Sequence, residues 1–282
     1  MRCILTATRP ETQGRRVLLQ AGRRSLCTNY LETETTINTK DVLKIGALKT
    51  RFSEFVGSDG IFPLLNKSQT ESFKKRVKWS DDDRQAAVLV LVCNVDGKPS
   101  ILFTHRSAHL SQHAAEISFP GGHVEKSETY ETAALRETCE ELLPPKGFLA
   151  QVQIIGRTTK LPSIRGTPVT PVLAVSPNYL SDVHELFPGN PNEVDLVFSA
   201  AVSDLVENEG SHVIPNNRFG NALAPTFATP HGEIWGLTAF ILRPLLHRVL
   251  KPVYLEGLYD KIDEELPQND APLCFSPNRS RR

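Results

Sequence analysis

The stretch "ISFPGGHVEKSETYETAALRETCEEL", residues 117–142, carries the clearest structural signals of this chain. Its first residues read as a strand, which ends where the glycine pair 121–122 lets the backbone turn sharply. A helix is expected next, because Ser127 is a favourable capping residue and residues 133–135 are good helix formers. The stretch therefore predicts a strand, a tight turn and an amphipathic helix in direct succession.

The predicted helix is unusually acidic. From Glu128 onward the stretch holds five glutamates and a single basic residue, Arg136. Like charges three or four residues apart cost a helix roughly 0.2–0.5 kcal/mol per pair. At about 3.6 residues per turn, Glu137 and Glu141 lie about 40° apart around the axis and Glu140 about 60° to the other side of Glu137. One stripe of carboxylates suits a hard cation such as Mg2+ or Mn2+, whose charge offsets the repulsion. A solvated acidic helix is the alternative interpretation.

Apolar runs on both sides of this stretch predict further strands. The β-branched run at residues 86–93 is followed by the turn "NVDGKPS" and by "ILFTHR", which indicates a hairpin. Later strands are expected at "VQIIGRTT", "VTPVLAV" and "EVDLVFSAAV", and a C-terminal helix over residues 232–250 in spite of Pro244. Strands that bracket two substantial helices predict an α/β layered domain.

Composition limits the classes of function. The chain has 282 residues with 40% apolar content, enough for one well-buried domain plus appendages. Its 32 basic and 32 acidic residues give no net positive charge that would attract nucleic acid or an anionic membrane. An anionic ligand must therefore be bound by a local group of basic residues. The apolar runs fall far short of the roughly 20 residues of a membrane helix. Five cysteines without a CxxC spacing argue against a disulfide scaffold and a thiolate zinc site.

The ends of the chain differ from its middle. Residues 1–30 contain six arginines, no lysine and one acid, which is typical of a mitochondrial transit peptide; a disordered basic tail is the alternative. The C-terminal "NRSRR" lacks a peroxisomal ending of the SKL type, so a mitochondrial location is expected before a peroxisomal one. We expect a helical or partly ordered lead-in at 31–83, the main domain at 84–262 and a disordered tail at 263–282.

The acidic helix carries a family resemblance. Gly122, five residues, Glu128, seven residues and then "RETCEEL" resemble the Nudix box, G-x5-E-x7-R-E-U-x-E-E-x-G-U, where U is a bulky apolar residue. Every charged position matches. Thr138 stands where an apolar residue is expected, and Leu143 with Pro144 replaces the glycine and the last apolar residue. The chain is thus identified as a member of the Nudix hydrolases, which implies an α/β/α sandwich with a mixed sheet between helices.

The resemblance also implies roles for residues. It implies a site for Mg2+ or Mn2+ whose ligands are Glu137, Glu141, Glu140 and the carbonyl oxygen of Gly122. Glu140 either completes this site or assists as a base, and Arg136 either orients a glutamate or forms a simple helix salt bridge. Glu128 binds a second metal or stabilises the start of the helix. Glu193 is a candidate ligand from outside the box.

The segment before the box narrows the range of expected substrates. "LFTHRSAHLSQHAAEISFPGG", residues 102–122, resembles the motif L-L-T-x-R-S-x-x-L-x-x-x-x-G-x-V-x-F-P-G-G of coenzyme A diphosphatases, the mitochondrial ones in particular, with Ala115 in place of its first glycine. The resemblance implies hydrolysis of coenzyme A or acyl-coenzyme A to 3′,5′-ADP and 4′-phosphopantetheine or its acyl derivative. Arg106 is a candidate for binding a substrate phosphate, with an ordinary surface arginine as the alternative.

Two other functions stay open. One is a Nudix hydrolase of another nucleoside diphosphate derivative, such as ADP-ribose or a dinucleotide. The other is a catalytically silent binding module, against which the three glutamates of the box argue. In each case the expected partner is a small molecule, without nucleic acid or membrane, and the chain is expected as a monomer or homodimer.

Overall fold

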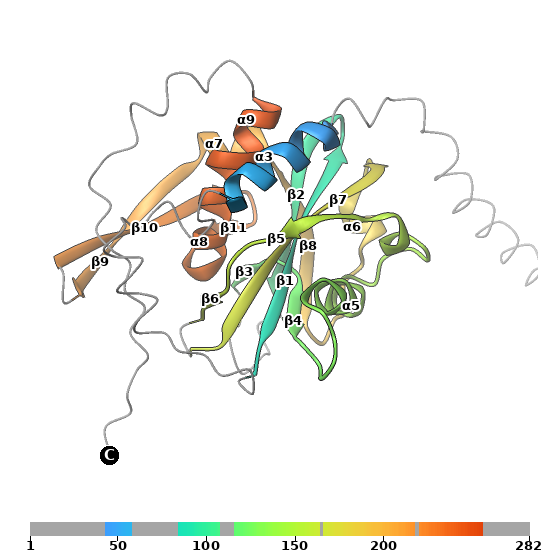
Figure 1. Cartoon of the computed structure of the whole chain (residues 1–282), viewed down its shortest axis with the longest axis horizontal. Helices are drawn as coiled ribbons and strands as arrows, with labels where there is room; N and C mark the ends of the chain where they lie inside the picture. The colour runs from blue at the N-terminus through green and yellow to red at the C-terminus, as the bar shows by residue number, and fades with distance from the viewer. Residues whose placement is uncertain (1–42, 58–83, 108–115, 164–165, 218–219, 256–282) are drawn as a thin grey trace, which may run out of the picture. The chain divides into compact units, whose positions relative to one another are not determined.

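The computed structural model describes residues 43–57, 84–107, 116–163, 166–217 and 220–255 (Figure 1). The expected transit peptide and the expected C-terminal tail lie outside these residues.

The predicted hairpin is confirmed. β1 (Ala86–Val95) and β2 (Lys98–Arg106) are antiparallel neighbours, with Val95 opposite Lys98. The two residues between them, Asp96 and Gly97, both have positive φ, 50° and 79°. An Asp-Gly pair with this backbone is the preferred two-residue hairpin turn, because its twist matches that of the strands.

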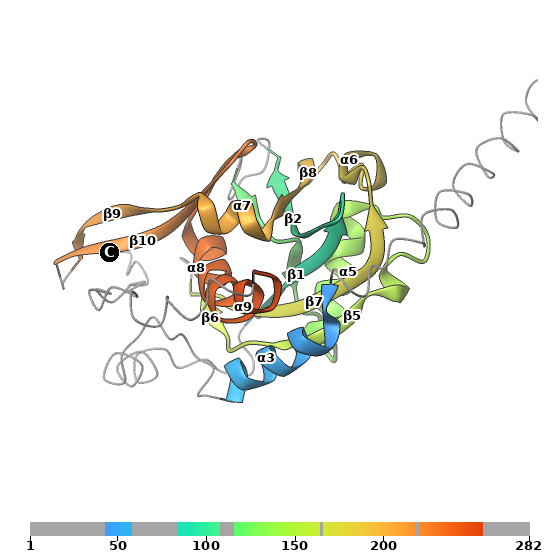
Figure 2. The same ribbon diagram turned by 90° about the horizontal axis from the view of Figure 1, so that it is seen from above.

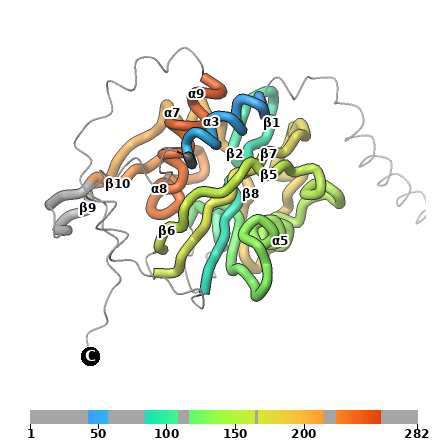
Figure 3. The backbone as a smooth tube through the Cα atoms, viewed as in Figure 1, coloured from blue at the N-terminus to red at the C-terminus, as the bar shows by residue number. Residues whose placement is uncertain are grey.

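A mixed eight-stranded sheet forms the centre of the molecule (Figure 1, Figure 3). Its main order is β3-β2-β1-β7-β5, with β4 on β1, β6 on β7 and β8 on β2. β1 and β7 are parallel, and the remaining pairs are antiparallel. The other strands are β3 (Ile117–Ser118), β4 (Gly121–His123), β5 (Gln153–Arg157), β6 (Leu161–Pro162), β7 (Pro168–Leu180) and β8 (Val194–Ala201).

Helices cover both faces of this sheet. α5 (Tyr130–Leu142) packs on one face, and α3 (Ile45–Gly57), α7 (Val202–Glu207), α8 (Gly236–Leu245), the π-helical turn η2 (Leu246–Leu250) and α9 (Lys251–Tyr254) pack on the other. Figure 2 shows α3 and α9 side by side. Short helices η1 (Leu149–Gln151) and α6 (Val183–Leu186) lie in connections. None of the helices among the described residues is long and apolar enough to cross a membrane.

A smaller antiparallel sheet extends from the main body (Figure 2). It contains β9 (Glu209–Asn217), β10 (Gly220–Thr229) and β11 (Gly232–Ile234), with β10 in the middle. β11 corrects one expectation, since residues 232–234 were expected to begin the C-terminal helix. They pair with β10 instead, and the helix begins only at Gly236, whose φ of 62° makes the turn between strand and helix.

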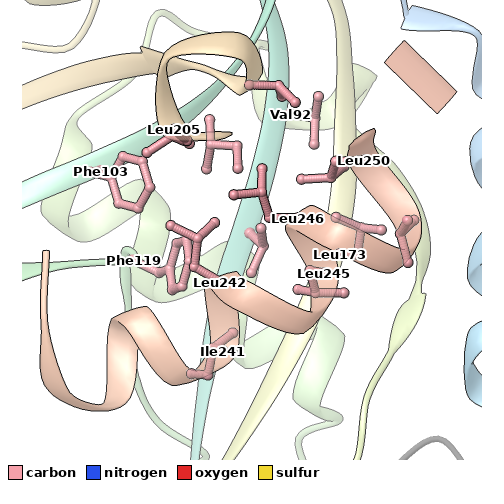
Figure 4. Close-up of a cluster of buried hydrophobic side chains, with 14 of the residues drawn as sticks. Val92, Phe103, Phe119, Leu173, Leu205, Ile241, Leu242, Leu245, Leu246 and Leu250 are labelled. Carbon is pink, nitrogen blue, oxygen red and sulfur yellow. The ribbon is translucent and has the colours of Figure 1, made fainter. Parts of the chain in front are cut away.

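The uniform apolar character of β1 reflects burial on both faces. Leu89 and Leu91 belong to the core beneath α5, whereas Val90 and Val92 belong to the core beneath α8 and η2 (Figure 4). Alternate residues of a strand point to opposite faces, so a central strand between two helical layers needs apolar residues at every position. The α/β/α sandwich predicted from the sequence is confirmed.

The start of α5 differs from expectation. Thr129, not Ser127, is its N-cap, and the Thr129 Oγ1 atom accepts a hydrogen bond from the backbone N–H of Thr132 at 3.1 Å. Ser127 lies in the preceding turn with φ 71°, a conformation that cannot cap this helix. As a result, Glu128 lies ahead of the helix and is free to approach it from the side.

Candidate active site

The two glycines of β4 bring its backbone against β1 and α5. Gly121 pairs with Val88 and Gly122 with Ala87. A Cβ atom on Gly121 would lie 2.3 Å from the carbonyl oxygen of Ala87, and its φ of 148° is one that few L-residues adopt. Gly121 therefore allows the close approach of β4 to β1.

Gly122 provides the equivalent contact on the side of α5. A Cβ atom there would lie only 2.4 Å from the Cδ and Oε2 atoms of Glu137. The Glu137 carboxylate thus lies directly against the backbone of β4, in space that only a glycine leaves open. Its side chain is 19% exposed.

Glu141 lies one turn further along α5 and is almost fully buried. Its Oε2 atom accepts a hydrogen bond from the backbone N–H of Gly121 at 3.0 Å, and its Oε1 atom accepts one from Arg106 Nη1 at 3.3 Å. Burial raises the pKa of Glu141 to about 7, while Gly121 and Arg106 oppose this rise and the charges of Glu193 and Glu137 add to it. This carboxyl therefore exchanges its proton near neutral pH.

Arg136 connects the remaining acidic groups. Its Nε and Nη2 atoms form a bidentate pair with Glu128, both at 3.0 Å, which lowers the pKa of Glu128. Nη1 donates to Glu137 at 3.1 Å and lies 3.4 Å from Glu140, and Nη2 also donates to the carbonyl of His123 at 2.9 Å. One guanidinium thus fixes the turn before α5 to the acidic stripe.

The three box glutamates are not equivalent. Glu137 and Glu141 lie against consecutive residues of β4, whereas the Glu140 side chain is 56% exposed and, among the described residues, contacts Arg136 alone. Within the described part of the chain, no three carboxylate, imidazole or thiolate groups gather in an arrangement that could hold a metal ion. The oxygen donors at Gly122 nevertheless fit a hard cation, because two carboxylates and a backbone carbonyl are the ligand types that Mg2+ and Mn2+ prefer.

Sequence reasoning did not anticipate the pair between Arg106 and Glu141. The two residues are 35 positions apart, and Arg106 was considered as a contact for a substrate phosphate or as an ordinary surface arginine. β2 carries Arg106 to the site, and the next residue, Ser107, donates its backbone N–H to the carbonyl of Glu193 at 2.9 Å. Glu193, the candidate from outside the box, is in this way brought close enough to influence the pKa of Glu141.

Comparisons with known proteins place this site in context. A family model described as "NUDIX domain" matches residues 83–216. An "Uncharacterized Nudix hydrolase NudL" of Photorhabdus laumondii is 34% identical over 189 residues, which cover 66% of this chain and 96% of that protein. The protein of the same name from Salmonella newport is 34% identical over 175 residues, 61% of this chain and 86% of its own. A solved structure, a Nudix hydrolase from M. smegmatis called RenU, has 24% identity and a TM-score of 0.35 over 44% of this chain and 74% of its own.

The relatives overturn the expected location. They are bacterial proteins, and bacteria contain neither mitochondria nor peroxisomes, so the mitochondrial expectation and its peroxisomal alternative are wrong. The expectation depended on the arginine content of residues 1–30 alone. An arginine-rich composition is a statistical signal and specifies no compartment by itself.

Proposed function

The chain belongs to the Nudix family and is a hydrolase of phosphorus-containing acid anhydrides, and from that premise we propose that it cleaves the diphosphate linkage of a nucleoside diphosphate derivative. Within this class we propose coenzyme A and acyl-coenzyme A as substrates, with 3′,5′-ADP and 4′-phosphopantetheine or its acyl derivative as products. The observation that carries the proposal is the placement of the Glu137 and Glu141 carboxylates against the two glycines of β4.

The choice of coenzyme A has its own support. It depends on the resemblance of residues 102–122 to the motif of coenzyme A diphosphatases. The comparisons favour the broader alternative, another nucleoside diphosphate derivative such as ADP-ribose or a dinucleotide, because the matched relatives are named as Nudix hydrolases without a substrate. A direct test of substrates is therefore needed.

Nudix enzymes generally need divalent metal ions. We propose that Mg2+ or Mn2+ is held by the side chains of Glu137 and Glu141 and by the carbonyl oxygen of Gly122, and that Glu140 takes the second of the two roles considered for it, that of a base. A cation in this position would neutralise diphosphate oxygens and lower the pKa of a water molecule toward neutrality. Burial raises the pKa of Glu141 to about 7, and a cation beside this carboxylate would lower that pKa and favour the charged form that binds metal.

The side chains around the cation divide the remaining tasks. Glu140 is exposed, so its carboxylate accepts the proton of the attacking water and passes it to solvent. Arg136 holds Glu137 in position while its bidentate pair anchors the turn at Glu128. Arg106 donates one N–H to Glu141, and its buried Nε atom has no hydrogen-bond partner among the described residues. We propose that Arg106 binds an oxygen of the diphosphate beside Glu141.

Product analysis tests the proposal. The wild-type protein is incubated with Mg2+ or Mn2+ and with coenzyme A, ADP-ribose or NADH, and the products are separated by chromatography. Release of 3′,5′-ADP from coenzyme A is expected. A preference for ADP-ribose or NADH would show that the substrate is another nucleoside diphosphate derivative and not coenzyme A.

Two variants then test the site itself. Glu140→Gln should lower turnover about a hundredfold or more if it removes the base. Glu207→Gln is the matched control, because Glu207 is an exposed glutamate of α7 on the opposite face of the sheet. Equal turnover in the two variants would show that Glu140 is not the base.

A further inference from the structure

A second group of charged residues surrounds the first residue of α5, Tyr130. The guanidinium carbon of Arg157 lies 5.0 Å from the centre of the Tyr130 ring, and the Lys160 Nζ atom lies 5.2 Å from it. Arg157 is the last residue of β5, and Lys160 lies between β5 and β6. An aromatic ring attracts cations through its negative face, so Tyr130 holds both positive groups at this end of α5.

Gln85 fixes the position of the lysine. The Lys160 Nζ atom donates to the Gln85 Oε1 atom at 2.7 Å, and the hydroxyl of Tyr130 donates to the same oxygen. Gln85 immediately precedes β1, and its carbonyl accepts a hydrogen bond from the N–H of Val124 at 2.9 Å. Lys160 is therefore held at the end of the sheet where β1 meets β4, the strand that carries Gly121 and Gly122.

The charge of this group is not balanced within the described residues. Glu131 is the one carboxylate in contact, with its Oε1 atom 3.6 Å from Arg157 Nε. Lys160 makes no ion pair with a described residue, and only one of the three N–H groups of its ammonium is used by Gln85. Two cations against one carboxylate leave an excess of one positive charge, with donors available to an anion.

The group lies in line with the candidate active site. Tyr130 and Glu137 are seven residues apart, so they point to the same side of α5, about 20° from each other around the axis and about 10 Å along it. Arg106 and Glu141 lie at the opposite end of the helix. A nucleotide whose ribose carries a diphosphate and a separate phosphate monoester would place the two groups at successive positions along this side of α5.

We propose that Lys160 and Arg157 bind a phosphate monoester on the nucleotide half of the substrate, separate from the diphosphate that is cleaved. The inference depends on the proposed function and narrows it. It assigns as substrates those nucleoside diphosphate derivatives that carry a further phosphate group on the ribose, as coenzyme A does and ADP-ribose does not. It also separates the roles of the cations, because Arg106 beside Glu141 serves the diphosphate that both kinds of substrate share.

The test compares coenzyme A with dephospho-coenzyme A, which differ only in the 3′-phosphate. We measure kcat/KM for both substrates with the wild-type chain and with Lys160→Met. The ratio of the two kcat/KM values should fall about ten- to a hundredfold in Lys160→Met, which corresponds to the loss of one charged hydrogen bond. Lys160→Arg keeps the charge and should retain most of the ratio.

Lys146→Met serves as the matched control. Lys146 is an exposed lysine in the turn after α5, at the end of the helix away from Tyr130, and its removal changes the net charge by the same amount. If Lys160→Met lowered kcat/KM equally for both substrates, Lys160 would act through its bond to Gln85 as a structural residue. In that case the ratio of the two kcat/KM values would be the same in Lys160→Met as in the wild-type chain, and the proposal would be overturned.

A binding measurement separates this inference from the proposed function. Isothermal titration calorimetry with 3′,5′-ADP and with AMP requires no turnover, and these probes also differ by one phosphate monoester. The wild-type chain should bind 3′,5′-ADP more tightly, and Lys160→Met should remove the difference. If the wild-type chain hydrolysed neither form of coenzyme A, the proposed substrate would be wrong, whereas the binding preference would still support the monoester site. Equal binding of both probes would overturn the monoester site itself.

Discussion

Replacing Gly122 by alanine tests the geometry of the active site with a single methyl group. The new Cβ atom would lie 2.4 Å from the Cδ and Oε2 atoms of Glu137, whereas ordinary contacts of a Cβ atom begin near 3.4 Å. The Glu137 carboxylate must therefore retreat by about 1 Å. The backbone of Gly122 has no positive φ, so the alanine itself brings no backbone strain.

The displacement should affect activity far more than stability. A misplacement of about 1 Å in a catalytic constellation costs on the order of a hundredfold in rate. The displaced atoms are the end of a flexible side chain, and alanine in place of glycine restricts the unfolded chain, which favours folding by up to about 1 kcal/mol. We therefore expect Gly122→Ala to fold normally and to lose about two orders of magnitude in kcat/KM.

Gly121→Ala provides the contrast, because its Cβ atom would collide with backbone atoms. It would lie 2.3 Å from the carbonyl oxygen of Ala87 and 2.6 Å from the Cα atom of Val88, at a φ of 148°. Neither neighbour can rotate away, so this variant should lose stability together with activity.

The assay pairs thermal unfolding, followed by circular dichroism, with initial rates over a titration of Mg2+. The rates are measured on the nucleoside diphosphate derivative that the wild-type enzyme cleaves best. Wild-type turnover and an unchanged Mg2+ requirement in Gly122→Ala would refute the role assigned to the Glu137 carboxylate. A melting temperature as low as that of Gly121→Ala would refute the explanation by side-chain displacement.

Three further perturbations follow from the same contacts. Burial raises the pKa of Glu141 from its usual value near 4.5 to about 7, so the metal-free protein should lose stability as the pH rises between these values. Urea unfolding at pH 5 and pH 8 measures this loss of stability, and the variant Glu141→Gln should not show it. Leu143 is 47% exposed and has φ 51° where the Nudix box has glycine, so Leu143→Gly should raise the free energy of unfolding by about 1 kcal/mol in denaturant titrations. Arg136→Lys keeps the charge but loses the bidentate pair with Glu128, and steady-state kinetics should show roughly a tenfold lower kcat with little change in melting temperature.

The fold was predictable because its main signals are local. The continuous apolar run of β1 already indicates a strand between two layers, and the Asp-Gly pair at residues 96–97 already specifies the hairpin to β2. The start of α5 was predicted less well. Ser127 and Thr129 are both good capping residues, and the choice between them depends on the turn that the bidentate pair of Glu128 and Arg136 stabilises.

The site was predictable only where it lies on one helix. Helical spacing placed Glu137 and Glu141 on one stripe, and both lie against β4 in the structure. The same spacing put Glu140 on that stripe, but an offset of about 60° is enough to turn its side chain toward solvent and Arg136. Helical spacing does not indicate which side chains the facing strand has room for. Here the consecutive glycines of β4 leave room for the carboxylates of Glu137 and Glu141, whereas Glu140 points away from β4.

In the proposed scheme, the basic residues at the two ends of α5 divide the recognition of substrate between them. A chain with equal numbers of acidic and basic residues can hold an anion only by local charge, so each phosphate of a substrate needs its own cations. Arg106 donates a hydrogen bond to Glu141, and in the role proposed for it this residue would meet the diphosphate that all the candidate substrates share. In that role Arg106 would not distinguish coenzyme A from ADP-ribose. Selectivity for coenzyme A would then come from a cation at a distance from the cleaved bond, and Lys160, with its place beside Tyr130 and its available donors, is our candidate for that cation.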